Sequence, residues 1–306
     1  MKPKIAISIG DINGVGLEIA LRAHEEISKI CKPVYCINET MLAWGSAMLG
    51  IDIPKKFKTK ECGDVFEILP GVSTKEAGEL SFDSFITAIA LAKSKKVSAI
   101  VTLPINKSSW AKAGIKYKGH TDALSDLLEC KTTMMLGCEK MYVMLFTHHI
   151  PLKDVSSKIT SKKLLKFLLD MSKYIDSDKI AVLGLNPHAG DDGVIGDEDI
   201  EIKKAIQKAN KILAKELFKG PLVPDTAFSE ENRKIYNYFI CMYHDQGLIP
   251  LKALYFYDSI NITLNNSIIR TSVDHGTAFD IAYKNRDISL LSYINAVKKS
   301  LNSYNI

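Results

Sequence analysis

Histidines concentrate at the ends of predicted strands, where α/β proteins usually carry their chemistry. Of the seven histidines, only His24 falls in the middle of a predicted helix. The other six occur at or just after strand ends, beside Gly, Pro, Asp or Thr, and are His120, His148, His149, His188, His244 and His275. Because ligands bind outside the carboxyl ends of strands, we expect these imidazoles to converge on one crevice as metal ligands or acid–base groups.

Three of these histidines favour a metal site. They follow three separate apolar segments, residues 141–147, 182–185 and 240–243, and each opens a polar loop. Three neutral imidazoles with one open coordination position suit a catalytic divalent metal. No two of them share the local H-x-x-x-H spacing, so three unrelated loop histidines remain the alternative.

Basic and hydroxyl residues predict an anionic partner. Residues 119–122 (Gly-His-Thr-Asp) lead into a predicted helix, where backbone N–H groups and Thr121 can face a phosphate or a carboxylate. A simple N-cap is the alternative for Thr121 and Asp122. Lys252 and Arg270 are cations embedded in apolar sequence, and a phosphorylated substrate would supply their counter-charge.

The loop at residues 10–18 follows a strand and opens a helix, but it fails the dinucleotide-binding test. After Gly14 and Gly16, the third glycine of G-x-G-x-x-G would fall at Ile19, and no G-x-x-x-x-G-K-[ST] motif occurs. Any nucleotide cofactor therefore binds outside a standard Rossmann loop. Polar residues of this loop suit either a place in the cleft or a turn-stabilising role.

Short apolar runs and amphipathic segments alternate along the whole chain and would position these residues. The predicted strands are residues 4–9, 33–37, 97–103, 141–147, 179–185, 238–243 and 259–264. The predicted helices are residues 15–29, 75–95, 161–174, 197–213 and 288–301. Several strands are too uniformly apolar to have a solvated face, which indicates buried parallel strands with helices packed on the sheet. The predicted fold class is therefore α/β.

Composition excludes several classes of protein. The 306 residues are 46% hydrophobic and 25% charged, which excludes disordered, collagen-like and coiled-coil chains. The formal charge of +5 is interleaved along helices, so we expect no nucleic-acid partner. No apolar run reaches the ~18 residues of a membrane span, and no signal peptide is evident, so we expect a cytoplasmic protein without a membrane partner. The six scattered cysteines are interpreted as reduced core thiols.

Six motifs occur in order along the chain: Gly119-His120-Thr121, Thr147-His148-His149-Ile150-Pro151-Leu152, Asn186-Pro187-His188-Ala189-Gly190, Pro224-Asp225-Thr226, Met242-Tyr243-His244-Asp245-Gln246-Gly247, and residues 270–278. Together they resemble the 4-hydroxythreonine-4-phosphate dehydrogenase family of pyridoxal 5′-phosphate biosynthesis, and the resemblance runs from residue 10 to about residue 296. The resemblance implies the fold of the isocitrate and isopropylmalate dehydrogenases, with two α/β domains around a cleft. The approximate domains are residues 1–118 with 276–306, carrying the nucleotide-side loop, and residues 119–275, carrying substrate, metal and dimerisation functions.

The resemblance also implies the roles of individual residues. The metal ligands of the family match His149, His188 and His244. Its substrate contacts match His120, Thr121, Lys252, Asn261 and Arg270. The adenosine-side loop of the nucleotide matches His275, Gly276, Thr277 and Ala278. The candidates for moving a proton or orienting a metal ligand are Asp225, Asp245 and Lys107.

The implied reaction is a metal-assisted oxidation. A divalent ion (zinc, magnesium or cobalt) would bind the secondary hydroxyl and neighbouring amino group of 4-phosphooxy-L-threonine and lower the pKa of that hydroxyl. Hydride would pass to NAD or NADP, and the product, 2-amino-3-oxo-4-phosphooxybutanoate, would lose its carboxylate to give 3-amino-2-oxopropyl phosphate. The family further implies a homodimer whose metal site is completed across the interface.

Departures from the family pattern leave other activities open. They are Leu17, Leu103 and the Asn265-Asn266-Ser267 turn, which lies between Asn261 and Arg270 and bears on the phosphate pocket. The alternatives are a dehydrogenase of threonate or erythronate phosphate, an aromatic dihydrodiol dehydrogenase, a metal-dependent phosphatase or other hydrolase, and a catalytically silent protein that binds a phosphorylated ligand.

Overall fold

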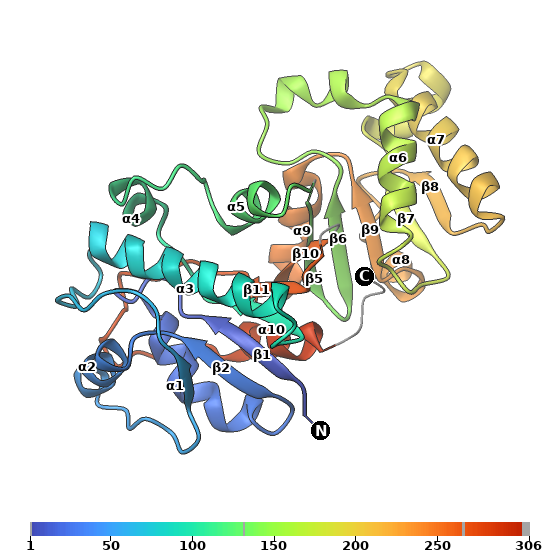
Figure 1. Ribbon diagram of the computed structural model, residues 1–306. Helices are drawn as coiled ribbons and strands as arrows, with labels where there is room; N and C mark the ends of the chain where they lie inside the picture. The colour runs from blue at the N-terminus through green and yellow to red at the C-terminus, as the bar shows by residue number, and fades with distance from the viewer. Residues whose placement is uncertain (1, 131, 265–266, 302–306) are drawn as a thin grey trace. The chain divides into compact units, whose positions relative to one another are not determined.

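The chain forms two compact units in the computed structural model, which describes residues 2–130, 132–264 and 267–301 (Figure 1). The first unit contains the described residues up to Thr132 and from Ile260 onward, and the second runs from Thr133 to Ser259. Both units alternate strands with helices, which confirms the predicted α/β class. The division at residues 118 and 275 expected from the family stays a prediction.

The first unit is built on a mostly parallel sheet. Its strands, in spatial order, are β3 (Lys58–Lys60), β2 (Lys32–Cys36), β1 (Lys4–Ser8), β4 (Ala99–Thr102), β11 (Arg270–Val273) and β10 (Ile260–Leu264). Neighbours pair in parallel except β10, which runs antiparallel to β11. The predicted strand at 259–264 is thus correct in position, but it is not one of the parallel strands. All four residues of β4 are buried, as expected for a strand covered on both faces.

Helices cover both faces of this sheet (Figure 1). They are α1 (Gly16–Ile27), α2 (Glu39–Leu49), α3 (Lys75–Lys93), α4 (Lys107–Lys112), α5 (His120–Leu127) and α10 (Leu291–Ser300). On one face, Phe85 of α3 and Trp110 of α4 pack with Ile100 of β4 in a buried core. On the other, the Thr271 hydroxyl donates to the carbonyl of Ala296 in α10 at 2.8 Å. Residues 100, 102, 270 and 272 therefore point toward α3 and α4, because side chains alternate along each strand.

The second unit contains five strands and four α-helices in its described residues. Its strands, in spatial order, are β5 (Thr133–Cys138), β6 (Met141–Leu145), β9 (Tyr238–Cys241), β7 (Ile180–Leu183) and β8 (Phe218–Leu222). The β5–β6 pair is antiparallel and the other pairs are parallel. The helices are α6 (Ser161–Met171), α7 (Glu198–Leu213), α8 (Glu230–Ile235) and α9 (His244–Tyr255), with short 3₁₀ turns at Leu152–Asp154, Ser156–Lys158 and Pro187–Gly193.

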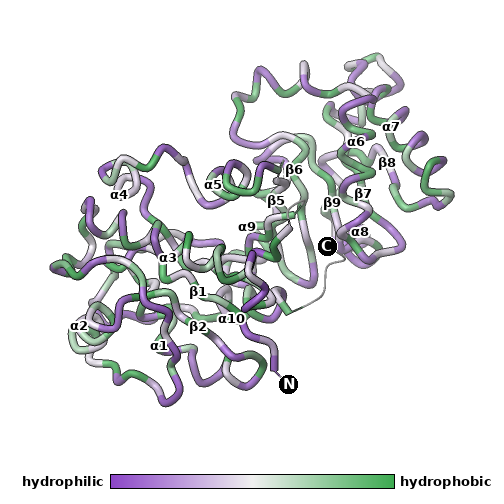
Figure 2. The backbone as a smooth tube through the Cα atoms, in the orientation of Figure 1, coloured by the Kyte–Doolittle hydropathy of each residue, from purple (hydrophilic) through white to green (hydrophobic). Residues whose placement is uncertain are grey.

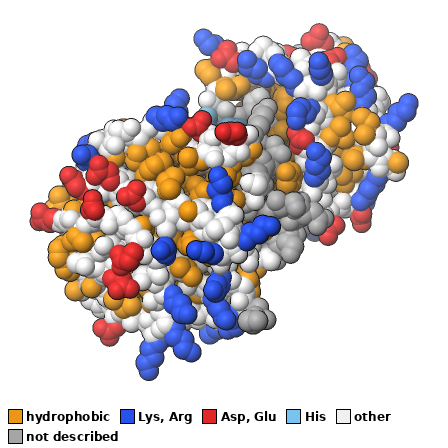
Figure 3. All heavy atoms as spheres, in the orientation of Figure 1, with side chains coloured by type: hydrophobic (Ala, Val, Ile, Leu, Met, Phe, Trp, Pro, Cys, Tyr) orange, Lys and Arg blue, Asp and Glu red, His pale blue; other side chains and the backbone are white. Residues whose placement is uncertain are grey.

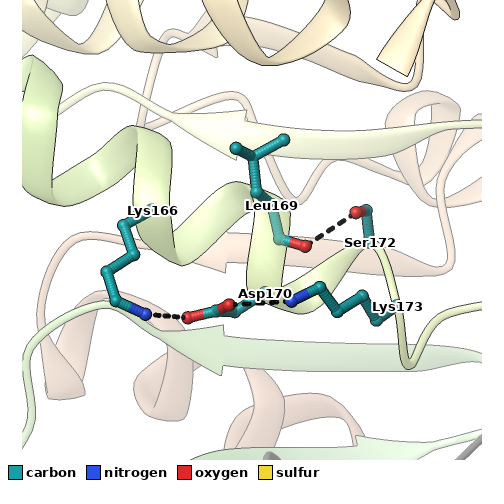
Figure 4. A network of polar contacts seen from close by, with 5 residues as sticks. All are labelled: Lys166, Leu169, Asp170, Ser172 and Lys173. Atoms are coloured by element: carbon teal, nitrogen blue, oxygen red, sulfur yellow. Dashed lines mark hydrogen bonds and ion pairs between the residues drawn. The ribbon is translucent and has the colours of Figure 1, made fainter. Parts of the chain in front are cut away.

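The helices of the second unit show why the periodic segments fold as predicted. Hydrophobic and hydrophilic residues alternate along α6 and α7 (Figure 2), and Leu164 and Leu168 of α6 are fully buried. On its outer side, Asp170 accepts from Lys166 at 2.8 Å and from Lys173 at 3.3 Å (Figure 4). Such exposed pairs are worth only about 0–1 kcal/mol each, so the apolar face holds the helix in place.

Charges of both signs are intermixed with hydrophobic side chains on the face shown in Figure 3. None of the helices in the described segments is long and apolar enough to cross a bilayer. Leu17 and Leu103, which depart from the family pattern, are fully buried. Asn265 and Asn266 lie outside the described residues.

Several elements were not predicted from the sequence, namely β3, β5, β8, β11, α2, α4, α8 and α9. The helix α9 corrects the expectation that His244 opens a polar loop, because His244 is instead the first residue of this helix. Gln246 explains the change: its side chain accepts from the Met242 N–H and donates to the Gly184 carbonyl, both at 2.7 Å. A side chain two residues into the helix thus holds its first turn against the neighbouring strand.

The two tryptophans provide a test of the first core. Trp110 is 0% exposed and donates to the Ser81 hydroxyl at 2.6 Å, whereas Trp44 is 47% exposed. We expect Trp110→Ala to lower the free energy of unfolding by about 3–5 kcal/mol, because it leaves a cavity and removes the hydrogen bond to the Ser81 hydroxyl. The matched Trp44→Ala variant should cost about 1 kcal/mol or less. Urea unfolding followed by circular dichroism measures both, and equal losses would contradict this description of the core.

Candidate active site

Arg270 is a buried cation in the first unit. Its side chain is 2% exposed, its Nη1 donates to Thr263 Oγ1 at 2.9 Å and its Nη2 donates to Thr102 Oγ1 at 2.7 Å. The Nε atom is buried without a hydrogen-bond partner, and among the described residues no carboxylate lies within ion-pair distance of the guanidinium. Burial lowers the pKa of Arg270 to about 9, so the side chain remains charged at neutral pH. A buried charge of this kind requires an anion.

His120 lies beside this cation. It is the first residue of α5, and its ring packs edge-on against Phe85 and Trp110, with centroid distances of 4.7 and 5.5 Å. Burial, and secondarily the positive charge of Arg270, lower the pKa of His120 well below its usual value. The imidazole is therefore neutral at pH 7, and its buried Nε2 has no hydrogen-bond partner.

A row of polar side chains crosses the sheet next to Arg270. The strand registers place Ser8, Thr102, Ser272 and Asn261 side by side on β1, β4, β11 and β10. Asn261 Oδ1 is buried without a partner, as are Arg270 Nε and His120 Nε2. Ser8 Oγ is likewise buried without a partner. Buried polar atoms are normally hydrogen-bonded, so these four unpaired ones on or beside a single face indicate a ligand that supplies the missing contacts. Thr121, which follows His120 in α5, is half-buried.

The loop assigned to the nucleotide lies against the glycine-containing loop of residues 10–16. The Val15 N–H donates to the Thr277 carbonyl at 3.0 Å, and Tyr283 donates to the Ile12 carbonyl at 2.9 Å. A Cβ at Gly14 would lie 2.8 Å from the Thr277 oxygen, so glycine is required there. His275 Nδ1 lies 3.0 Å from the Gly276 carbonyl. The two loops therefore form one continuous backbone surface, although neither carries a Rossmann fingerprint.

Two further polar residues of the first unit are positioned by backbone contacts. Asp11 is buried, its N–H donates to the Pro104 carbonyl at 2.8 Å, and burial raises the pKa of its carboxyl. Lys107, a candidate for proton transfer, begins α4 and is exposed, while Asn106 caps this helix by accepting from the Ser109 N–H at 2.9 Å. Asp11 Oδ1 accepts from the Asn13 N–H at 3.0 Å and so stabilises its turn, whereas its Oδ2 is buried without a hydrogen-bond partner, and a role in the cleft stays a prediction.

The second unit brings two of the predicted metal ligands together. The ring centroids of His149 and His244 are 5.6 Å apart, and those of His148 and His149 are 5.3 Å apart. His244 Nδ1 lies 2.7 Å from the Asp245 carboxylate. A carboxylate on one ring nitrogen fixes the tautomer and leaves Nε2 as the donor, which is the usual arrangement around a metal-binding histidine. These two imidazoles fit a divalent ion.

His188 lies in an unusual left-handed turn. Residues 188–192 all have positive φ, between 46° and 77°. Asp199, at the start of α7, accepts from the Leu185 and Asn186 N–H groups at 2.8 and 3.1 Å and so anchors the preceding segment. In the part of the chain that the structure describes, no group of three metal-ligating side chains is assembled. His188 as a third ligand stays a prediction.

The remaining assigned residues lie in the second unit. Lys252, half-buried in α9, has its Nζ 3.4 Å from the Ser259 hydroxyl and 5.2 Å from the ring centroid of Phe256. Asp225 is exposed in the turn between β8 and α8, whereas Asp245 contacts His244 as described above.

Sequence reasoning missed Thr102 and Thr263 of the first unit, because a threonine in a strand has no local signal for binding an arginine on the neighbouring strand.

Comparison with known proteins identifies the family. Residues 29–300 match the family model described as pyridoxal phosphate biosynthetic protein PdxA. A Sulfurimonas denitrificans protein named 4-hydroxythreonine-4-phosphate dehydrogenase is 56% identical over 98% of this chain and 97% of its own length. A Campylobacter fetus protein with the same name is 54% identical over 97% of this chain and 96% of its own length.

Solved structures agree with this result. The crystal structure of a Klebsiella pneumoniae 4-hydroxythreonine-4-phosphate dehydrogenase has a TM-score of 0.82 and 32% identity, covering 98% of this chain and 99% of that one. A terephthalate dihydrodiol dehydrogenase from Burkholderia xenovorans shares the fold, with a TM-score of 0.68, 20% identity and 98% coverage of both chains. The chain is thus an α/β protein with a fold found in these dehydrogenases. It belongs to the PdxA family, as its motifs predict.

The neutral state of His120 predicts a pH dependence of stability. Because its folded pKa is lowered, the unfolded chain binds a proton that the folded chain does not, and stability falls as pH drops below about 6.5. We expect His120→Gln to reduce this loss by up to about 1.4 kcal/mol per pH unit in that window. Denaturant unfolding at pH 7.0, 6.0 and 5.5 measures the slope.

The control for this measurement is His188→Gln, which changes an exposed histidine. His24, whose pKa is also lowered by burial, is present in both variants and contributes equally to each. A pH slope of His120→Gln identical to that of the control would show that His120 is not the group responsible.

Proposed function

We propose that the chain oxidises 4-phosphooxy-L-threonine with NAD or NADP to 2-amino-3-oxo-4-phosphooxybutanoate, which loses CO₂ to give 3-amino-2-oxopropyl phosphate in pyridoxal phosphate biosynthesis. Family membership and the names of the relatives support this activity. The observation that carries it is the buried Arg270, which is charged, has no carboxylate partner in the segments that the structure describes and lies beside His120, whose Nε2 is unpaired. We also propose a cytoplasmic location.

The phosphate-binding role is assigned to residues of the first unit. Arg270 offers a buried positive charge and a free Nε–H, and Asn261 offers an amide on the neighbouring strand. Thr121 and the backbone N–H groups at the start of α5 add donors directed at an anion. His120 is neutral, so it contributes a directed hydrogen bond. We assign Lys252 of α9 a supporting role as a second cation for the substrate.

The metal-binding role is assigned to residues of the second unit. His149 and His244 would hold the ion, and His188 is proposed as a third ligand. When bound, a divalent ion supplies Lewis acidity that lowers the pKa of the substrate hydroxyl. Asp245 holds His244 in the tautomer that presents Nε2. Imidazole donors suit zinc or cobalt better than magnesium, which prefers oxygen ligands.

Proton transfer and cofactor binding complete the proposal. Asp245 is engaged with His244, which supports an orienting role, and Asp225 and Lys107 are proposed as acceptors of the hydroxyl proton. The loop His275-Gly276-Thr277-Ala278 is proposed to bind the adenosine side of NAD or NADP. Its attachment to the loop at residues 10–16 through Val15 and Tyr283 would keep this surface rigid.

We further propose that the chain acts as a homodimer in which a second copy completes the metal site. Large hydrophobic side chains are exposed on α9 and directly after it, at Ile249, Leu254, Phe256 and Tyr257. Contiguous exposed apolar residues commonly mark an interface. Of the three proposed metal ligands, the second unit brings only His149 and His244 together, and no group of three metal-ligating side chains is assembled in the described residues, so a ligand from a partner would complete the set.

Steady-state kinetics test the proposed reaction. We expect nicotinamide reduction at the 340 nm band with 4-phosphooxy-L-threonine, loss of activity on treatment with a chelator, and recovery when Zn²⁺ or Co²⁺ is added. His244→Ala should lower kcat by more than about 100-fold and weaken zinc binding, with an unchanged circular dichroism spectrum. Full activity of the metal-depleted His188→Ala/His244→Ala double variant would refute the metal assignment.

Parallel assays separate the alternatives. Faster turnover of threonate or erythronate phosphate would assign a related dehydrogenase. Release of inorganic phosphate without nucleotide would indicate a phosphatase, and binding without turnover would indicate a silent ligand-binding protein. The first result changes the substrate only, whereas the other two overturn the proposed reaction.

A matched pair of isoleucines tests the dimer. Ile249 on α9 is 68% exposed and Ile212 on α7 is 61% exposed. We expect Ile249→Glu to convert a dimer into a monomer in size-exclusion chromatography with light scattering, because a charge would be buried in the interface. Ile212→Glu should leave the dimer intact. A wild-type monomer, or equal behaviour of the two variants, would contradict the proposed surface.

A further inference from the structure

Arg270 is held by hydroxyl groups where buried arginines usually have carboxylates. Thr263 on β10 and Thr102 on β4 accept from its two terminal nitrogens at 2.9 and 2.7 Å. Both threonines are buried, and their β-branched side chains have few rotamers, so the guanidinium is held from two sides by rigid acceptors. Its third nitrogen, Nε, is left unpaired.

Strand register creates this arrangement. β11 lies between β4 and β10, and Thr263 is directly opposite Arg270 in the antiparallel pair. Ile100 is opposite Arg270, and Thr102, opposite Ser272, is two residues nearer the carboxyl end of β4. The arginine side chain therefore extends toward the polar row that contains Ser8, Ser272 and Asn261, and it reaches Thr102 there. The hydroxyls thus direct the charge toward the carboxyl ends of the strands.

Neutral acceptors have a different electrostatic consequence from charged ones. A carboxylate at either position would pair with Arg270 and cancel most of its charge in a region of low dielectric constant. A phosphate arriving later would then meet a neutral pair. A hydroxyl satisfies the N–H group but leaves the net charge, whose desolvation is unfavourable until an anion binds.

We propose that Thr102 and Thr263 are positioning residues that orient Arg270 and, because they are uncharged, preserve its full positive charge for the anionic group of the substrate. This inference rests on the proposed function, since it assumes that Arg270 contacts the phosphate. His120 supports the same arrangement: it is the other polar group facing Arg270 from α5, and it is neutral. The three polar side chains that the described residues place against Arg270, those of Thr102, Thr263 and His120, are therefore uncharged.

The decisive comparison is Thr102→Asn against Thr102→Asp, because the two side chains have nearly the same shape and differ in charge. We expect Thr102→Asp to raise the KM for 4-phosphooxy-L-threonine, and the inhibition constant of inorganic phosphate, about tenfold more than Thr102→Asn does. The kcat should change much less than KM. Thr102→Ser, which keeps the hydroxyl, should restore KM to within about threefold of the wild-type value. The NAD KM serves as an internal control and should not follow this order.

Equal KM values for the Asn and Asp variants, or a KM for Thr102→Val like that of the wild type, would overturn the proposal. Circular dichroism establishes that each variant is folded, and the Thr263→Asn and Thr263→Asp pair provides the same comparison if a Thr102 variant does not fold.

The Arg270→Ala variant distinguishes failure of the proposed phosphate contact from failure of the proposed role of the threonines. If Arg270→Ala leaves the substrate KM unchanged, the phosphate assignment fails. If it raises KM while the Asn and Asp variants agree, only the role of the threonines fails.

Discussion

The uncompensated charge of Arg270 is the constraint on which the site in the first unit depends. A guanidinium that is 2% exposed and has no carboxylate partner among the described residues is unfavourable, and the sheet tolerates it by providing two hydroxyl acceptors from neighbouring strands. The same environment keeps His120 neutral. If the first unit binds an anion as proposed, part of the binding free energy would come from relieving this unfavourable state.

The second unit is organised by backbone conformation. Asp199 anchors the segment before the left-handed turn at residues 188–192, and Asp245 holds His244 beside His149. Non-glycine residues with positive φ cost about 1–2 kcal/mol each, so a run of them persists only where surrounding contacts enforce it. The histidines of this unit thus depend on carboxylates that are not themselves proposed metal ligands.

Much of the fold followed from local patterns, and the missed elements have specific causes. The strands at 4–8 and 141–145 are apolar and were predicted closely. The strand β11 was missed because Arg270-Thr271-Ser272-Val273 is polar for a buried strand and depends on pairing with β4 and β10, which no local pattern reveals. The helix α9 was missed because it contains Gly247 and Pro250, which usually interrupt helices.

The sequence by itself determined the α/β class, the family and the residue types at the site, because these depend on hydrophobic periodicity and on short motifs. Tertiary structure decided which groups meet. Thr102 and Arg270 are 168 residues apart, and their contact exists only because β4 and β11 pair in one register. A shift of one residue would turn each side chain to the opposite face, and no local pattern specifies that register. The neutrality of His120 and the lowered pKa of Arg270 likewise follow from burial, which the folded chain alone establishes.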